Sequence, residues 1–144
     1  ARFSAKKRHY IYKIINRSAP CALEARRAWQ IPYKIDVAKM QEAAKSLIGY
    51  HDFTTFRASA CQAKTPWRSV EKIEISQEGD RIELLVSAPS FLHNQIRSFM
   101  GSLVEVGRGK WPVEGIKQAL HAVDRARCGP VAPPYGLYFY KVDY

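Results

Sequence analysis

The sequence has 144 residues, 47% of them hydrophobic and 25% charged, which is typical of one globular domain with a core of its own. No apolar run approaches the roughly 20 residues that a membrane-spanning helix requires, so we expect no membrane partner. The cysteines Cys21, Cys61 and Cys128 are odd in number and lack metal-ligand spacing. This favours free thiols in a reducing compartment such as the cytoplasm, and no metal site.

The formal net charge of +10 is concentrated near the N-terminal end. Residues 1–34 hold nine Lys or Arg against one acid, whereas residues 35–144 hold fourteen against twelve. A basic segment that also carries aromatic residues favours a polyanionic partner, usually a nucleic acid. The chain starts at Ala1 without a methionine, and we expect it to be a fragment or a processed chain.

Alternating residues predict a first strand over residues 6–15, with its tyrosines on one face. A long connection follows, in which a short helical turn is expected at residues 23–29. Asp36 is the expected N-cap of a helix over residues 37–49 that ends at its glycine. Residues 51–57 are expected to form a loop or a short extended piece.

The second half of the chain predicts a hairpin of two strands, residues 69–77 and 81–88, with a glycine at the turn. After a central helix, described next, a third helix is expected at residues 112–123 and a last strand at residues 136–144. The hairpin implies antiparallel pairing. The order predicts the α+β class, with a mixed, mainly antiparallel sheet packed by helices, in a single domain over residues 1–144.

The central helix is expected over residues 90–107, where apolar residues recur at helical spacing. Ser90 is the expected N-cap, and Gly107 the left-handed stop. Arg97 lies at the edge of the apolar stripe, where a guanidinium needs an anion to offset its desolvation. Gly101, one turn later, leaves room for another backbone or a ligand. Without further information, a snorkelling Arg and a tolerated Gly explain the pattern equally well.

Three stretches carry a family resemblance. They read Phe-Leu-His-Asn-Gln-Ile-Arg with Gly-Ser-Leu and Glu-Val-Gly in the central helix, Arg-Phe-Ser-Ala followed by Tyr-Ile-Tyr at the first strand, and Pro-Tyr-Gly-Leu-Tyr at residues 134–138. Together they resemble the TruA-type family of tRNA pseudouridine synthases, as do residues 52–57 and 61–68. The resemblance covers essentially all of the chain and corresponds to the C-terminal half of the family's pseudouridine synthase fold.

The resemblance implies roles for three residues. Tyr10 matches a Tyr that stacks on the flipped target base. Arg97 matches an Arg that pairs with the catalytic aspartate and orients it, which typically lowers a carboxyl pKa by about 1–3 units. Leu137 matches a Leu that packs against the base or the Tyr. Taken alone, Tyr10 and Leu137 would be ordinary strand residues, and His93 and Asn94 are expected on the helix surface.

Basic residues are expected to contact backbone phosphates, which position an RNA without reading its sequence. A solvated surface position is an equally good interpretation for each of them: Arg2, Lys6, Lys7, Arg8, Arg57, Lys64 and Arg68. Phe53 and Trp67, which lie in the same region of the sequence as the last three, are expected in the core.

One motif of the family is missing. Its nucleophile is the Asp of a Gly-Arg-Thr-Asp-Ala-Gly motif, and none of the five aspartates of this chain has those neighbours. We therefore expect the nucleophile to come from an N-terminal half of the same enzyme, and this chain to be inactive alone.

The resemblance implies conversion of uridine to pseudouridine in the anticodon stem-loop of tRNA, by a homodimer, without metal or cofactor. The alternative is a non-catalytic RNA-binding module. A hydrolase that uses Cys61 and His51 is a much weaker interpretation, because the chain has no glycine cluster suited to an oxyanion site.

Overall fold

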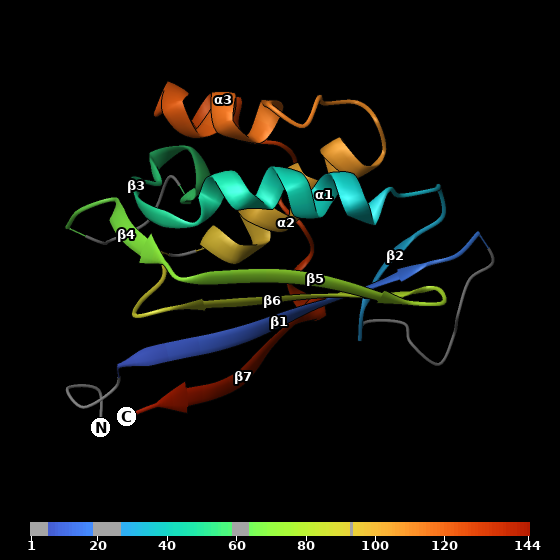
Figure 1. Ribbon diagram of the computed structural model, residues 1–144, viewed down its shortest axis with the longest axis horizontal. Coiled ribbons are helices and arrows are strands. Elements are labelled where there is room, and N and C mark those ends of the chain that lie inside the picture. Colours follow the sequence, from blue (N-terminus) through green and yellow to red (C-terminus); the bar gives the residue numbers. More distant parts are fainter. Residues whose placement is uncertain (1–5, 19–26, 59–63, 93) are drawn as a thin grey trace.

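The computed structural model describes residues 6–18, 27–58, 64–92 and 94–144. Its helices cover one face of a mixed sheet and leave the other face open (Figure 1). This arrangement confirms the predicted α+β class with a mainly antiparallel sheet. None of the helices in the described ranges is long and apolar enough to cross a membrane.

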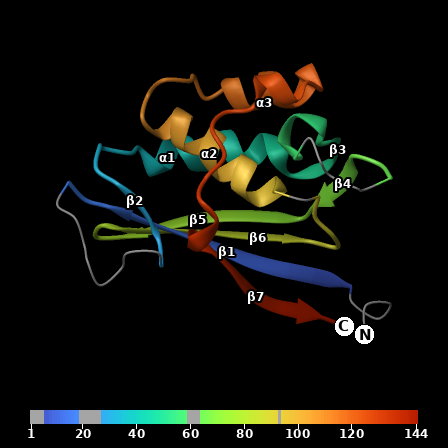
Figure 2. The same ribbon diagram turned by 180° about the vertical axis from the view of Figure 1, so that it is seen from behind.

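Strand β1 (Lys7–Asn16) is the centre of the sheet. On one edge it pairs antiparallel with β6 (Arg81–Ala88), which in turn pairs with β5 (Lys72–Glu78). Its other edge is shared: β7 (Leu137–Asp143) pairs antiparallel with the first half, and β2 (Trp29–Ile31) pairs parallel with the second half. The start of β1 and the end of β7 therefore lie side by side at one end of the sheet (Figure 2).

Three helices pack above the sheet: α1 (Val37–Ala44), α2 (Gln95–Gly107) and α3 (Gly115–Ala122). Asp36 is the N-cap of α1, as predicted, and its Oδ1 accepts a hydrogen bond of 3.1 Å from the backbone N–H of Lys39. Short 3₁₀ turns follow or separate the main elements, at Lys45–Leu47, Thr54–Phe56, Arg125–Arg127 and Pro134–Gly136.

A separate two-stranded sheet lies beside the helices and was not predicted. It pairs β3 (Gly49–Asp52) antiparallel with β4 (Trp67–Val70). The expected strand over residues 69–77 is therefore wrong at its start, because Ser69 and Val70 belong to β4 and β5 begins at Lys72. Four-residue strands are too short for an alternating pattern to stand out, and their pairing is non-local.

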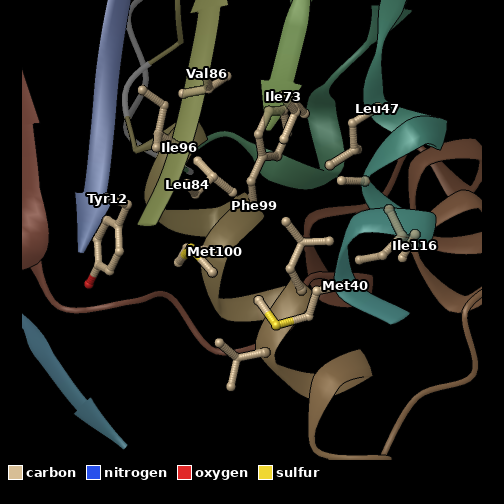
Figure 3. Packing of buried hydrophobic residues seen from close by; sticks show 14 of the residues in the cluster. Tyr12, Met40, Leu47, Ile73, Leu84, Val86, Ile96, Phe99, Met100 and Ile116 are labelled. Atoms are coloured by element: carbon tan, nitrogen blue, oxygen red, sulfur yellow. The ribbon is translucent and has the colours of Figure 1, made fainter. Parts of the chain in front are cut away.

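The core forms between the sheet and α2 (Figure 3). Tyr12 of β1 and Leu84 of β6 point from the sheet toward Phe99 and Met100 of α2, and all four are essentially inaccessible to solvent. The ring of Phe99 also meets two other buried aromatic rings edge-on, at centroid distances of 5.3 and 5.4 Å. Removing a side chain buried in this way typically costs about 3–5 kcal/mol.

The central helix begins later than predicted and ends at Gly107 as predicted, but Gly107 is not a left-handed stop. Ser90 is not its N-cap, because the helix begins at Gln95, whose Oε1 accepts a hydrogen bond of 2.7 Å from the N–H of Leu92. Gly107 is its last helical residue, and the left-handed glycine is Gly109, with φ of 87°. At Gly107 a Cβ would lie 2.6–2.9 Å from side chains of the core, so the glycine serves close packing there.

Other local expectations also needed correction. The helix after Asp36 ends at Ala44, well before Gly49, and α3 begins at Gly115 instead of Pro112. Trp29, expected in a helical turn, lies in strand β2. Phe53 is fully buried as predicted, whereas Trp67 is 44% exposed, so its expected place in the core is wrong. The rest of the turn expected at 23–29 falls mostly outside the described residues.

Candidate active site

A pocket of about 540 Å³ opens at the N-terminal end of α2. Tyr10 of β1, Arg97 of α2 and Leu137 of β7 all line it, and these are the three residues for which the sequence predicted roles at a site. They come together because β7 pairs with β1 while α2 packs on the same sheet. The other lining residues are Phe91, Leu92, Asn94, Gln95, Ile96 and Pro134.

Aromatic contacts hold Tyr10 in one orientation. Its ring meets Phe91 edge-on, with centroids 5.4 Å apart at 87°, and meets Phe139 at 5.5 Å and 76°. Edge-to-face pairs of this kind contribute about 0.5–1.5 kcal/mol beyond their buried area. The register between β1 and β7 shifts just before Tyr10, which brings Phe139 opposite it. The contacts of Phe91 and Phe139 with Tyr10 could not be predicted from the sequence, because both depend on tertiary packing.

The guanidinium of Arg97 is held by two neutral acceptors. Its Nε donates to the backbone carbonyl of Ala132 at 2.7 Å, and its Nη1 donates to Oδ1 of Asn94 at 3.0 Å. Within the described part of the chain, no carboxylate lies within 4.0 Å of this side chain. A half-buried guanidinium held only by neutral acceptors is a suitable partner for a carboxylate.

The segment that supplies the Ala132 carbonyl lies directly against α2. The N–H of Ala132 donates to the carbonyl of Arg97 at 3.1 Å, so two hydrogen bonds join the same pair of residues. A Cβ built on Gly101 would lie 1.5 Å from the carbonyl oxygen of Pro130. This confirms the prediction that Gly101 leaves room for another backbone, and shows that the close approach requires glycine.

Asn94 departs from its predicted role. It is the N-cap of α2 in a left-handed conformation, with φ of 61°, and it is half-buried against Arg97 instead of lying free on the helix surface. Asn is one of the few residues other than glycine that adopt this conformation readily. His93, the other residue expected on the surface, lies outside the described residues.

Tyr12 supports the segment that leads to Leu137. Its hydroxyl donates to the carbonyl of Pro133 at 2.5 Å, and a Cβ on Gly136 would lie 2.8 Å from its ring. Burial raises the pKa of Tyr12 well above its ordinary value, with a further contribution from the nearby Tyr135. The hydroxyl therefore stays protonated and remains a donor.

Of the basic residues predicted to contact RNA, those that the structure describes do not line this pocket. Lys6, Lys7 and Arg8 lie at the start of β1, where Lys7 pairs with Glu71 at 3.0 Å and Arg8 donates to the carbonyl of Pro89 at 2.8 Å. Lys6 is exposed.

The other basic residues that the structure describes lie around the 3₁₀ turn Thr54–Phe56 and strand β4. Arg57 is half-buried and Lys64 is exposed. Arg68 donates from Nη1 to the backbone carbonyls of Thr65 and Trp67. Arg2 lies outside the described residues. In the part of the chain that the structure describes, no three His, Cys, Asp or Glu side chains gather as a metal site would require.

Comparison with known proteins identifies relatives over the whole chain. A family model described as tRNA pseudouridine synthase matches residues 43–144. Proteins named tRNA pseudouridine synthase A from Sinorhizobium fredii, Rhizobium meliloti and Bartonella henselae are 57%, 57% and 56% identical to it over all 144 residues. The chain spans 58% of the length of each of these relatives.

Proposed function

This chain belongs to the tRNA pseudouridine synthase family, and from that premise we propose that the protein containing it isomerises uridine to pseudouridine in tRNA. The reaction breaks the glycosidic bond between N1 and the sugar, turns the base and rejoins it through C5. The observation that carries the proposal is the convergence of Tyr10, Arg97 and Leu137 on one pocket.

Each of the three residues has a part in the proposed reaction. Tyr10 would stack on the uracil once the nucleotide has left the RNA helix, and Leu137 would pack against the same base. Arg97 would pair with the nucleophilic carboxylate, keep it ionised and fix its direction. Because the Arg97 guanidinium is already held by two neutral acceptors, little ordering remains when the carboxylate binds.

We further propose that residues 1–144 are one domain, the C-terminal part of the enzyme, and that a preceding half supplies the nucleophile. The reason is that no aspartate of this sequence stands in a Gly-Arg-Thr-Asp-Ala-Gly motif. The 144-residue chain alone should then form no pseudouridine. We expect the enzyme to act in the cytoplasm as a homodimer on the anticodon stem-loop, with basic residues such as Lys6 and Lys64 contacting phosphates.

The experiment measures pseudouridine in tRNA transcripts incubated with the complete protein and with variants of it. Arg97→Ala and Tyr10→Ala should each lower the rate by at least about tenfold, because each removes a contact to the reacting groups. Arg108→Ala is the matched control for Arg97→Ala, since Arg108 is a half-buried Arg at the opposite end of the same helix.

Two results would contradict the proposal. If the complete protein binds tRNA but forms no pseudouridine, the non-catalytic RNA-binding module becomes the better account. If the 144-residue chain alone is active, the nucleophile does not come from a preceding half.

A further inference from the structure

An exposed pair of aromatic side chains lies away from the pocket that contains Arg97. Tyr50 and Trp67 are 65% and 44% exposed, yet their rings stack on each other, with centroids 5.1 Å apart and an angle of 29° between their planes. We call this pair the aromatic shelf. Each ring restrains the orientation of the other, and both remain exposed to water. Together they form a surface on which a further flat ring can stack.

The small sheet of β3 and β4 fixes the shelf. Tyr50 lies opposite Ser69, and Trp67 lies opposite Asp52, so the two aromatic residues are diagonal neighbours on one face of the strand pair. Diagonal neighbours are within reach of each other when their side chains are aromatic. The shelf is therefore set by the backbone pairing, and it does not require a ligand to form.

A groove of about 370 Å³ runs beside the shelf. Leu120, His121 and Val123, at the end of α3, form its other side. Val123 has φ of 49°, a left-handed conformation that costs a β-branched residue about 1–3 kcal/mol, and its side chain is 45% exposed. Strain of this kind tends to persist where it shapes a functional surface.

The polar groups of the groove have defined hydrogen-bonding roles. Nε2 of His51 lies 2.9 Å from the carbonyl oxygen of Ile48, to which it donates a hydrogen bond. Oδ1 of Asp52 accepts hydrogen bonds from both the N–H and the hydroxyl of Thr54, at 3.0 and 2.6 Å. The groove therefore combines an aromatic surface with a carboxylate, one oxygen of which is already bonded.

We propose that the aromatic shelf and its groove bind one unpaired base of the RNA substrate, at a position separate from the base that reacts. A nucleobase combines the flat ring that the shelf can stack on with an edge of hydrogen-bond donors that the Asp52 carboxylate in the groove can accept from. Lys64, which is exposed, and Arg68 lie close to Trp67 in the chain, and these cations favour a nucleic acid over a neutral peptide as the occupant. This inference rests on the proposed function, because it takes tRNA as the partner.

The shelf and the pocket could serve one RNA. In both ribbon views β4 and the N-terminal end of α2, where the pocket opens, lie at the same end of the molecule (Figures 1 and 2). The lining residues of the two sites do not overlap. A base held at the shelf would thus add affinity and fix the orientation of the RNA without touching the reacting atoms.

The test compares tRNA binding by the complete protein with binding by Tyr50→Ala and Trp67→Leu. Loss of a stacked base should raise Kd about 5- to 150-fold, corresponding to roughly 1–3 kcal/mol per base. The dependence of Kd on salt should keep its slope, since stacking releases no counterions, and the rate at saturating tRNA should not change. Trp67→Phe should retain most of the affinity, because it keeps an aromatic face.

Tyr144→Ala is the matched control, because Tyr144 is as exposed as Tyr50 and lies just after β7. The proposal is overturned if the shelf variants bind tRNA as tightly as this control does. It is also overturned if they change the oligomeric state of the protein, which would make the shelf a protein contact. If the unaltered protein neither binds nor modifies tRNA, the proposed function fails; if it does both while the shelf variants match the control, only this inference fails.

Discussion

Replacing Gly101 by alanine should separate the segment around Ala132 from α2. The added Cβ would lie 1.5 Å from the carbonyl oxygen of Pro130 and 2.7 Å from its carbonyl carbon. Because carbon atoms in contact normally lie about 3.5–4.0 Å apart, the backbone must move by about 2 Å. That movement breaks both hydrogen bonds between Arg97 and Ala132.

The cost of Gly101→Ala follows from three effects. Overpacking costs about 1–3 kcal/mol, and the two hydrogen bonds contribute about 0.5–1.5 kcal/mol each. The better helix propensity of alanine offsets about 1 kcal/mol of this. We expect the free energy of unfolding to fall by about 3 kcal/mol, measured by urea denaturation at an unchanged m-value. Pseudouridine formation by the folded fraction should also fall, because Arg97 loses the acceptor of its Nε.

Gly115→Ala provides the control for this experiment. Gly115 is also helical, but a Cβ there would lie 3.2 Å from the Cβ of Trp111, a side chain that needs to move by only a few tenths of an ångström. The change should cost less than about 1 kcal/mol. If Gly101→Ala is as stable as this control, the backbone does not approach α2 as closely as the structure shows, and our account of how Arg97 is held is wrong.

Three further predictions concern single side chains. Asn94→Asp puts a carboxylate beside Arg97 that competes with the nucleophile, so the rate in a pseudouridine assay should fall at least about tenfold while the stability to urea is kept. An unchanged rate would mean that Arg97 is not the partner of the nucleophile. Thr55→Val removes a buried hydroxyl that donates to one backbone carbonyl and accepts from one backbone N–H, so the free energy of unfolding should fall by about 1–3 kcal/mol. A fall of less than about 0.5 kcal/mol would contradict these two hydrogen bonds. The hydrogen bond from His9, 2.9 Å long, lowers the pKa of the Asp143 carboxyl below its ordinary value of 3.8. The ionised carboxylate therefore stabilises the fold above pH 3.8, and this stabilisation is lost as the pH falls through the lowered pKa. Below about pH 4 the urea midpoint of Asp143→Asn should fall less than that of the unaltered protein, and parallel curves for the two proteins would refute this.

The sequence by itself determined the features that depend on neighbouring residues. The alternation of β1, the hairpin of β5 and β6, and the Asp36 cap were all predicted, because strand period, turn glycine and capping carboxylate act over a few residues. The motif residues Tyr10, Arg97 and Leu137 were also identified from the sequence, and the structure brings them to one pocket.

The tertiary structure alone decided how the pocket is built. Arg97 is held by a carbonyl that lies 35 residues further along the chain. Helix α2 begins only at Gln95, because the residue before it, Asn94, has a left-handed backbone conformation. The exposed position of Trp67 follows from the pairing of β3 with β4, and no local sequence pattern predicted that pairing. Contacts between distant segments are set by the packing of whole elements. Short stretches of sequence show which residues are able to make such contacts, but they do not show which of these residues meet.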